Sequence, residues 1–179
     1  MANFDQYFPR LLQEEGGFVD NPDDPGGATN KGITLETFRS YAEPLLGIAP
    51  TLENLKQLTD QQAKQIYRRE YWDAVDGNRI INQDLAEMIC DFYVNAGDNA
   101  IRVLQRVINR LKEGRPLQVD GIMGPNTLAA VNSLDAASLY NDYKAARIQY
   151  YVELTETDPN LKVFLAGWID RVNSFPDIA

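Results

Sequence analysis

Residues 4–34 read FDQYFPRLLQEEGGFVDNPDDPGGATNKGIT and join two different patterns. Phe4, Phe8 and Leu11 recur at helical spacing, and two glycines follow Glu15. The remainder is rich in Asp, Asn, Pro and Gly, which is typical of turns and of a short β-hairpin. This segment therefore predicts a helix that ends at Glu15 and leads directly into a hairpin.

The rest of the chain predicts helices. Apolar residues at helical spacing, separated by turn residues, predict helices over 35–46, 85–97, 101–111, 125–131 and 139–154, and from Asp158 onward. A capping box of Thr59 and Gln62 predicts the start of one more helix. A chain of 179 residues suits one domain with, at most, a sub-lobe. No clear linker divides the chain, and a division would fall most readily at residues 112–125.

Composition excludes several kinds of chemistry. The chain has one cysteine and no histidine. Triads of Ser, His and Asp, Cys-His pairs and the usual histidine zinc sites are therefore excluded. We expect no metal and no organic cofactor, so that catalysis must use carboxylates, lysine, tyrosine or hydroxyls.

Charge and hydropathy narrow the choice of partners. The formal net charge is −9, so the basic surface expected of a nucleic-acid-binding protein is missing. No apolar run is long enough for membrane insertion. The first residues show neither the basic nor the apolar region of a signal peptide, and we expect none.

Glu15 is the first candidate for catalysis. At about 100° per residue, Glu15 lies about 20° from Phe4 on the helix, whereas Glu14 lies about 100° from Glu15. Burial and the negative end of the helix dipole both disfavour a charged carboxylate, so this position favours a protonated side chain. A general acid needs such a proton. The alternative is that both glutamates form a solvated helix end before a glycine cap.

The hairpin segment supplies a second carboxylate. Asp23 and Asp24 lie between Glu15 and Thr29, within the short segment that is predicted to form the hairpin. Two facing carboxyl groups are the minimum for glycoside hydrolysis, and their separation decides whether configuration is inverted or retained. Asp24, with Thr29, would hold and activate water. The alternative is a polar turn whose aspartates accept bonds from backbone amides.

Several motifs together resemble a known family. They are Glu15-Gly16-Gly17-Phe18, Asn21-Pro22, Asp24, Gly26-Gly27-Ala28-Thr29 and Gly32-Ile33-Thr34. This set resembles the signature of glycoside hydrolase family 108, whose members are N-acetylmuramidases, often phage or prophage endolysins. Later motifs, among them Asn95-Ala96-Gly97 and Val119-Asp120-Gly121, resemble the family's C-terminal predicted peptidoglycan-binding region.

The resemblance implies a fold and an activity. The fold would be mainly α, a lysozyme-like α+β arrangement with a small β-hairpin near residues 18–34 and an all-helical C-terminal lobe. Residues 1–97 would form the catalytic region, and residues 98–179 the peptidoglycan-binding region. The enzyme would cleave the β-1,4 bond between N-acetylmuramic acid and N-acetylglucosamine, without a cofactor.

The family's glutamate corresponds to Glu15. In the phage-type lysozymes of glycoside hydrolase family 24, which look similar in plan, a glutamate, an aspartate and a threonine lie at a helix end and hairpin. Eight residues separate Glu15 from Asp24, as in that family, but four rather than five separate Asp24 from Thr29. Glu14, Asp23 and Thr29 fit both gaps, although Glu14 faces the flank of the helix.

Weaker candidates would contact the substrate. Asn30 and Thr34 in the hairpin, and Asp91 and Asn95 on the 85–97 helix, are predicted to bind sugar. The last two residues could instead be helix caps. Tyr71 and Trp72 are the aromatic residues that we expect to stack on a sugar, whereas the other aromatic residues suit a core.

The expected partner is the glycan strand of peptidoglycan, bound by a monomer, although the sequence does not decide the oligomeric state. A lytic transglycosylase, or a wall-binding or secretion-associated protein without turnover, is the alternative. We expect synthesis in the cytoplasm and access to the periplasm through a holin or an export system.

Overall fold

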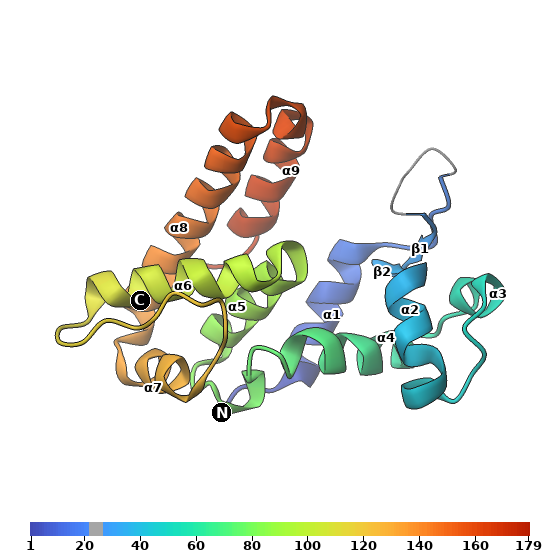
Figure 1. Cartoon of the computed structure of the whole chain (residues 1–179), viewed down its shortest axis with the longest axis horizontal. Coiled ribbons are helices and arrows are strands. Elements are labelled where there is room, and N and C mark those ends of the chain that lie inside the picture. The colour runs from blue at the N-terminus through green and yellow to red at the C-terminus, as the bar shows by residue number, and fades with distance from the viewer. Residues whose placement is uncertain (22–26) are drawn as a thin grey trace. The chain divides into compact units, whose positions relative to one another are not determined.

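The computed structural model describes residues 1–21 and 27–179. Contacts divide the chain into two compact units, Phe4–Trp72 and a second that combines Met1–Asn3 with Asp73–Ala179. We call the first the hairpin unit and the second the helical unit (Figure 1). The functional division predicted at residues 97 and 98 stays a prediction.

The hairpin unit contains the only strands assigned within the described residues. Its elements are α1 (Phe4–Glu15), β1 (Thr29–Asn30), β2 (Ile33–Thr34), α2 (Leu35–Tyr41), the π-helical turn η1 (Ala42–Leu46), α3 (Leu52–Lys56), α4 (Asp60–Tyr67) and the π-helical turn η2 (Arg68–Trp72). The predicted end of α1 at Glu15 and the capping box of Thr59 and Gln62 are confirmed. Helix α3 was not predicted, because five residues are too few to show a helical period.

Helix α1 supplies much of the core of this unit. Phe4, Tyr7, Phe8 and Leu11 are buried on its inner side. Trp72 is fully buried and its ring lies 5.4 Å from that of Phe4. The prediction that Trp72 stacks on a sugar is therefore wrong: the indole packs in the core.

The hairpin forms through a tight turn. Thr29 pairs with Thr34 and Asn30 with Ile33 in antiparallel register. Lys31 and Gly32 between them have φ angles of 52° and 74°, as a two-residue type I′ turn requires. Val19 bridges to Thr29 on the other side, with both backbone N–H···O distances at 2.8 Å. The predicted hairpin region near residues 18–34 is therefore confirmed.

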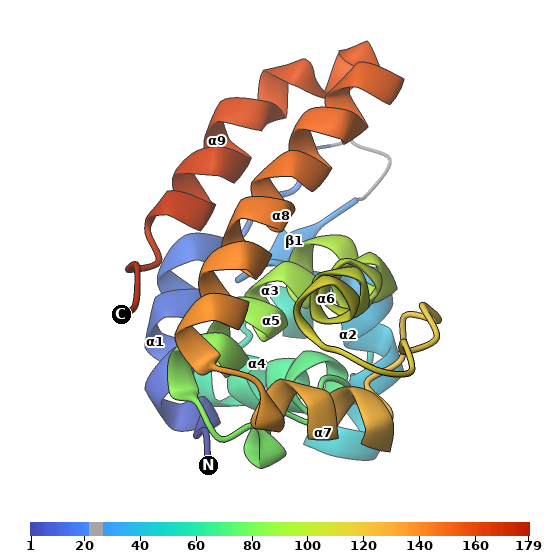
Figure 2. The ribbon, with the colours of Figure 1, turned by 90° about the vertical axis from the view of Figure 1, so that its left-hand side faces the viewer.

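Every regular element that the structure describes in the helical unit is a helix or a helical turn. Its elements are the 3₁₀ turn η3 (Gly77–Arg79), α5 (Gln83–Ala96), α6 (Asp98–Leu111), α7 (Pro125–Ser133), α8 (Ala136–Thr157), the 3₁₀ turn η4 (Pro159–Leu161) and α9 (Lys162–Asn173). Helices α8 and α9 lie side by side, and α6 packs on both α5 and α8 (Figure 2). Among the described helices, none has the length and apolar character needed to cross a bilayer.

Candidate active site

Glu15 lies at the C-terminal end of α1, against the turn of the hairpin. Its side chain is half-buried and its Oε1 atom is buried. A Cβ atom added to Gly32 would overlap Glu15 Oε2 and lie 2.5 Å from the hydroxyl oxygen of Tyr67. The absence of a side chain at Gly32 therefore lets the turn approach the Glu15 carboxyl group.

Three contacts hold this turn in place. The Tyr67 hydroxyl donates to the Lys31 carbonyl oxygen at 2.7 Å. Lys31 Nζ lies 2.9 Å from Asp60 Oδ1 at the start of α4. Asn30 Nδ2 donates to the Leu55 carbonyl oxygen at 2.8 Å. The turn that faces Glu15 is thus tied to both α3 and α4.

The other predicted catalytic residues belong to the hairpin segment. Asp24 and its alternative Asp23 lie outside the described residues. Thr29 is described, half-buried on β1 between Val19 and Thr34. The bridge from Val19 to Thr29 brings together the two ends of the segment that contains Asp24.

The other predicted hairpin residues make structural contacts. Asn30 is buried and also donates to the Lys56 carbonyl oxygen at 3.2 Å, so both its amide hydrogens have partners. Thr34 is the N-cap of α2, and its hydroxyl oxygen accepts from the Thr37 N–H at 3.2 Å. These contacts give both side chains a role in shaping the hairpin, and their predicted role in sugar binding stays a prediction.

Asp91 lies in the helical unit at the centre of an ion cluster. Its side chain has no exposed surface, and it receives bonds from Arg147 at 2.7 Å and Arg171 at 2.9 Å. Burial alone would raise the pKa of Asp91, but the two guanidinium charges outweigh it and lower the pKa below its usual value. An ionised carboxylate enclosed in this way is inaccessible to a sugar. Asn95, by contrast, is exposed near the end of α5.

Tyr67 and Lys31 were not predicted as site residues. Tyr67 follows Ala63 and Ile66 on the apolar side of α4, so its position indicated a core residue. The ring is indeed buried, and only its hydroxyl reaches the turn. A helical period locates a side chain on a face but does not locate its terminal oxygen. The only signal in the sequence for the positive φ of Gly32 was its position in a predicted turn.

Comparison with protein families defines the class of this protein. Residues 8–97 match glycosyl hydrolase 108, and residues 99–173 match a predicted peptidoglycan domain. The chain belongs to the glycosyl hydrolase 108 family. It is therefore a glycoside hydrolase, and peptidoglycan is its substrate.

A solved structure supports the same fold across the chain. The structure of Brucella abortus SagA is similar with a TM-score of 0.70 and 31% sequence identity, over 96% of this chain and 94% of that chain. The mainly α, lysozyme-like fold is thereby confirmed. No curated protein matches this sequence.

Proposed function

We propose that the protein is an N-acetylmuramidase in which Glu15 protonates the leaving oxygen of the β-1,4 bond between N-acetylmuramic acid and N-acetylglucosamine. The observation that carries this proposal is the position of Glu15. It ends the helix, is half-buried, and has the Gly32 turn and the Tyr67 hydroxyl beside it. A general acid must come within hydrogen-bond reach of the oxygen that it protonates, and a half-buried carboxyl group at a helix end remains partly open to a substrate.

Asp24 is the second carboxylate of this proposal. It would act as a base on water or stabilise the oxocarbenium-like charge of the transition state. In the sequence it lies between Val19 and Thr29, which pair through a backbone bridge. Thr29 would help to hold the attacking water.

Clearing of purified sacculi tests the assignment of the acid. Wild type is expected to solubilise the sacculi, and Glu15→Gln to do so about 10²–10⁴-fold more slowly, as for loss of a general acid. Glu14→Gln is the matched control, because it makes the same change one residue away on an exposed side chain. Equal clearing by Glu15→Gln and wild type would disprove the role of Glu15.

The released products test the bond and the route. Hydrolysis by a muramidase leaves a reducing N-acetylmuramic acid end, which mass spectrometry distinguishes from the anhydro end made by a transglycosylase. Products with reducing N-acetylglucosamine ends would place cleavage at the other glycosidic bond. Wild type that binds sacculi without releasing any product would contradict the muramidase proposal altogether.

A further inference from the structure

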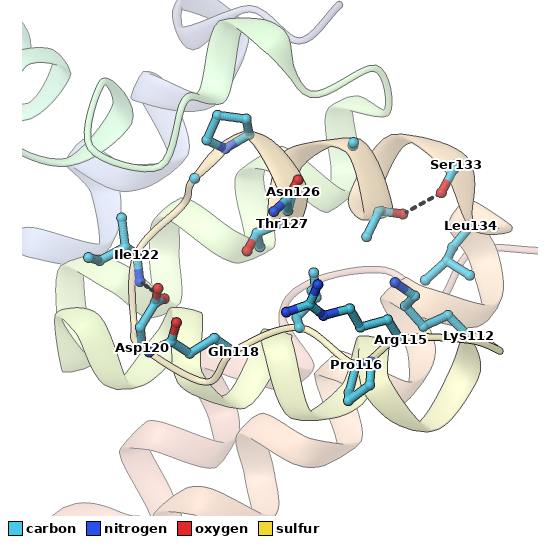
Figure 3. Close-up of a pocket in the computed structure, with 15 residues that line it drawn as sticks. Lys112, Arg115, Pro116, Gln118, Asp120, Ile122, Asn126, Thr127, Ser133 and Leu134 are labelled. Atoms are coloured by element: carbon cyan, nitrogen blue, oxygen red, sulfur yellow. Dashed lines mark hydrogen bonds between the residues drawn. The ribbon is translucent and has the colours of Figure 1, made fainter.

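The helical unit contains a pocket that the catalytic proposal does not use. It has a volume of about 790 Å³ and lies between residues 112–124 and α7 (Figure 3). Its lining includes Lys112, Arg115, Gln118, Asn126 and Thr127. In the close-up the side chains of Lys112 and Arg115 extend from one end of the loop toward α7.

The loop that forms one wall is held rigidly by a side chain of α6. Gln105 is almost fully buried, at 1% exposure. Its Nε2 atom donates to Asp120 Oδ1 at 2.8 Å and to Thr127 Oγ1 at 3.2 Å. Its Oε1 atom accepts from the backbone N–H groups of Asp120 and Gly121, both at 3.0 Å.

A second amide, one turn further along α6, extends this attachment. Asn109 Oδ1 accepts from the Leu117 N–H at 2.7 Å, and Asn109 Nδ2 donates to the Leu117 carbonyl oxygen at 3.0 Å. Residues 117–121 are thus attached to α6 by the side chains of both Gln105 and Asn109. The pocket wall is preorganised, which lowers the entropy cost of binding a ligand.

The charged side chains that line the pocket are two cations, Lys112 and Arg115, and one carboxylate, Asp120. The lining is therefore more basic than the chain as a whole, whose net charge is −9. Within the described residues, no carboxylate lies in ion-pairing distance of Lys112 or Arg115. Asp120 lines the pocket, but its Oδ1 atom already accepts from Gln105 and from the Ile122 N–H at 2.9 Å.

We propose that this pocket binds the peptide stem of peptidoglycan, with Lys112 and Arg115 holding a stem carboxylate. The inference rests on the proposed function in that it takes peptidoglycan as the ligand, and it names the part that is bound. Two cations suit a carboxylate, and the amides of Gln118 and Asn126 suit the peptide groups next to it. Glycan without a stem offers the cations only the lactyl carboxylate of muramic acid and no peptide groups beside it.

Binding to soluble muropeptides tests the proposal independently of catalysis. The protein is the full chain with Glu15→Gln, so that no ligand is hydrolysed. Three ligands are titrated by calorimetry: a disaccharide-tetrapeptide, the same compound with its carboxylates amidated, and the stem-free disaccharide. We expect measurable binding of the first ligand and at least tenfold weaker binding of the other two. The stem-free disaccharide retains the lactyl carboxylate of muramic acid, so it separates that source from the stem.

A double variant that lacks both cations of the pocket is the second test of the proposal. Lys112→Gln with Arg115→Gln is expected to weaken binding of the disaccharide-tetrapeptide at least tenfold. Arg110→Gln is the matched control, because Arg110 is an exposed cation of α6 outside the pocket lining. We expect less than a twofold change for it, and circular dichroism checks that each variant is folded.

The outcomes separate this proposal from the muramidase proposal. Unchanged binding by the double variant, or equal binding of the stem-free or amidated ligands, would overturn the stem-carboxylate site. Failure of wild type to cleave sacculi would overturn the muramidase proposal and leave the binding result as it stands. A parallel loss in Arg110→Gln would show a general charge effect, which also overturns the pocket site.

Discussion

Glu15 in the hairpin unit and Asp91 in the helical unit are both withdrawn from water, but their surroundings differ. Glu15 is half-buried at a helix end, with the Gly32 turn and the Tyr67 hydroxyl next to its carboxyl group. Asp91 is fully buried within α5, and two guanidinium groups bind both its oxygens. Two guanidinium charges compensate Asp91 and keep it ionised, whereas Glu15 remains partly exposed beside the hairpin turn.

This difference separates a structural carboxylate from a candidate catalytic one. Removal of one partner from a buried ion cluster leaves uncompensated charge in a medium of low polarity. Replacement of a half-buried carboxyl group at a helix end by a neutral amide leaves no such charge behind and should cost the fold little. Burial alone therefore does not identify function, and the neighbours of each carboxyl group decide it.

The largest effect on stability should come from Asp91→Asn. We expect a loss of about 3–5 kcal/mol in the free energy of unfolding, because Arg147 and Arg171 would be left with uncompensated charge. Urea unfolding measures this loss, with the exposed Asp170 as the control in Asp170→Asn. Glu15→Gln should cost under about 1 kcal/mol. A similar cost for both changes would remove the distinction drawn between the two carboxylates.

Gly32→Ala tests the close approach of the turn to Glu15. The added methyl group would meet Glu15 and Tyr67 in a backbone with φ of 74°. Gly47→Ala is the matched control, because Gly47 has φ of 67° and open space around it. We expect Gly32→Ala to cost about 1–3 kcal/mol more than the control, and to reduce sacculus clearing. Equal costs would show that only the backbone angle matters at Gly32.

Tyr67→Phe should have a smaller effect. It removes the hydroxyl that donates to the Lys31 carbonyl oxygen and leaves the buried ring in place. We expect a loss of about 0.5–1.5 kcal/mol in unfolding free energy, together with slower sacculus clearing. Clearing at the wild-type rate by a destabilised Tyr67→Phe protein would limit this tyrosine to a structural role.

The smallest effect concerns the pH dependence of the Asp91 cluster. Because the folded state lowers the pKa of Asp91 below 3.8, the stabilisation is complete well above that pH and is lost as pH falls through the lowered value. The difference in unfolding free energy between wild type and Asp91→Asn should narrow by about 0.4 kcal/mol near the ordinary pKa, and by more below it. Urea unfolding at several pH values measures this, and a constant difference would show that Asp91 does not titrate as proposed.

Local patterns predicted most elements of the fold. The capping box of Thr59 and Gln62, the helical spacing of Phe4, Phe8 and Leu11, and the Gly-rich hairpin segment each act over a few residues. These patterns placed Glu15 at the end of α1. They failed for Asp91, because α5 is buried on most of its circumference and an off-stripe position there still faces the core.

The sequence by itself determined a histidine-free, acidic, mainly helical chain with Glu15 at a helix end and a hairpin next to it. Those properties follow from composition and from interactions between residues close together in the chain. Only the tertiary structure decided that Gly32 and Tyr67 meet Glu15, that Arg147 and Arg171 enclose Asp91, and that Gln105 shapes a basic pocket. These contacts join residues 15 to 80 positions apart, and no local pattern records which distant partner will fill a given space.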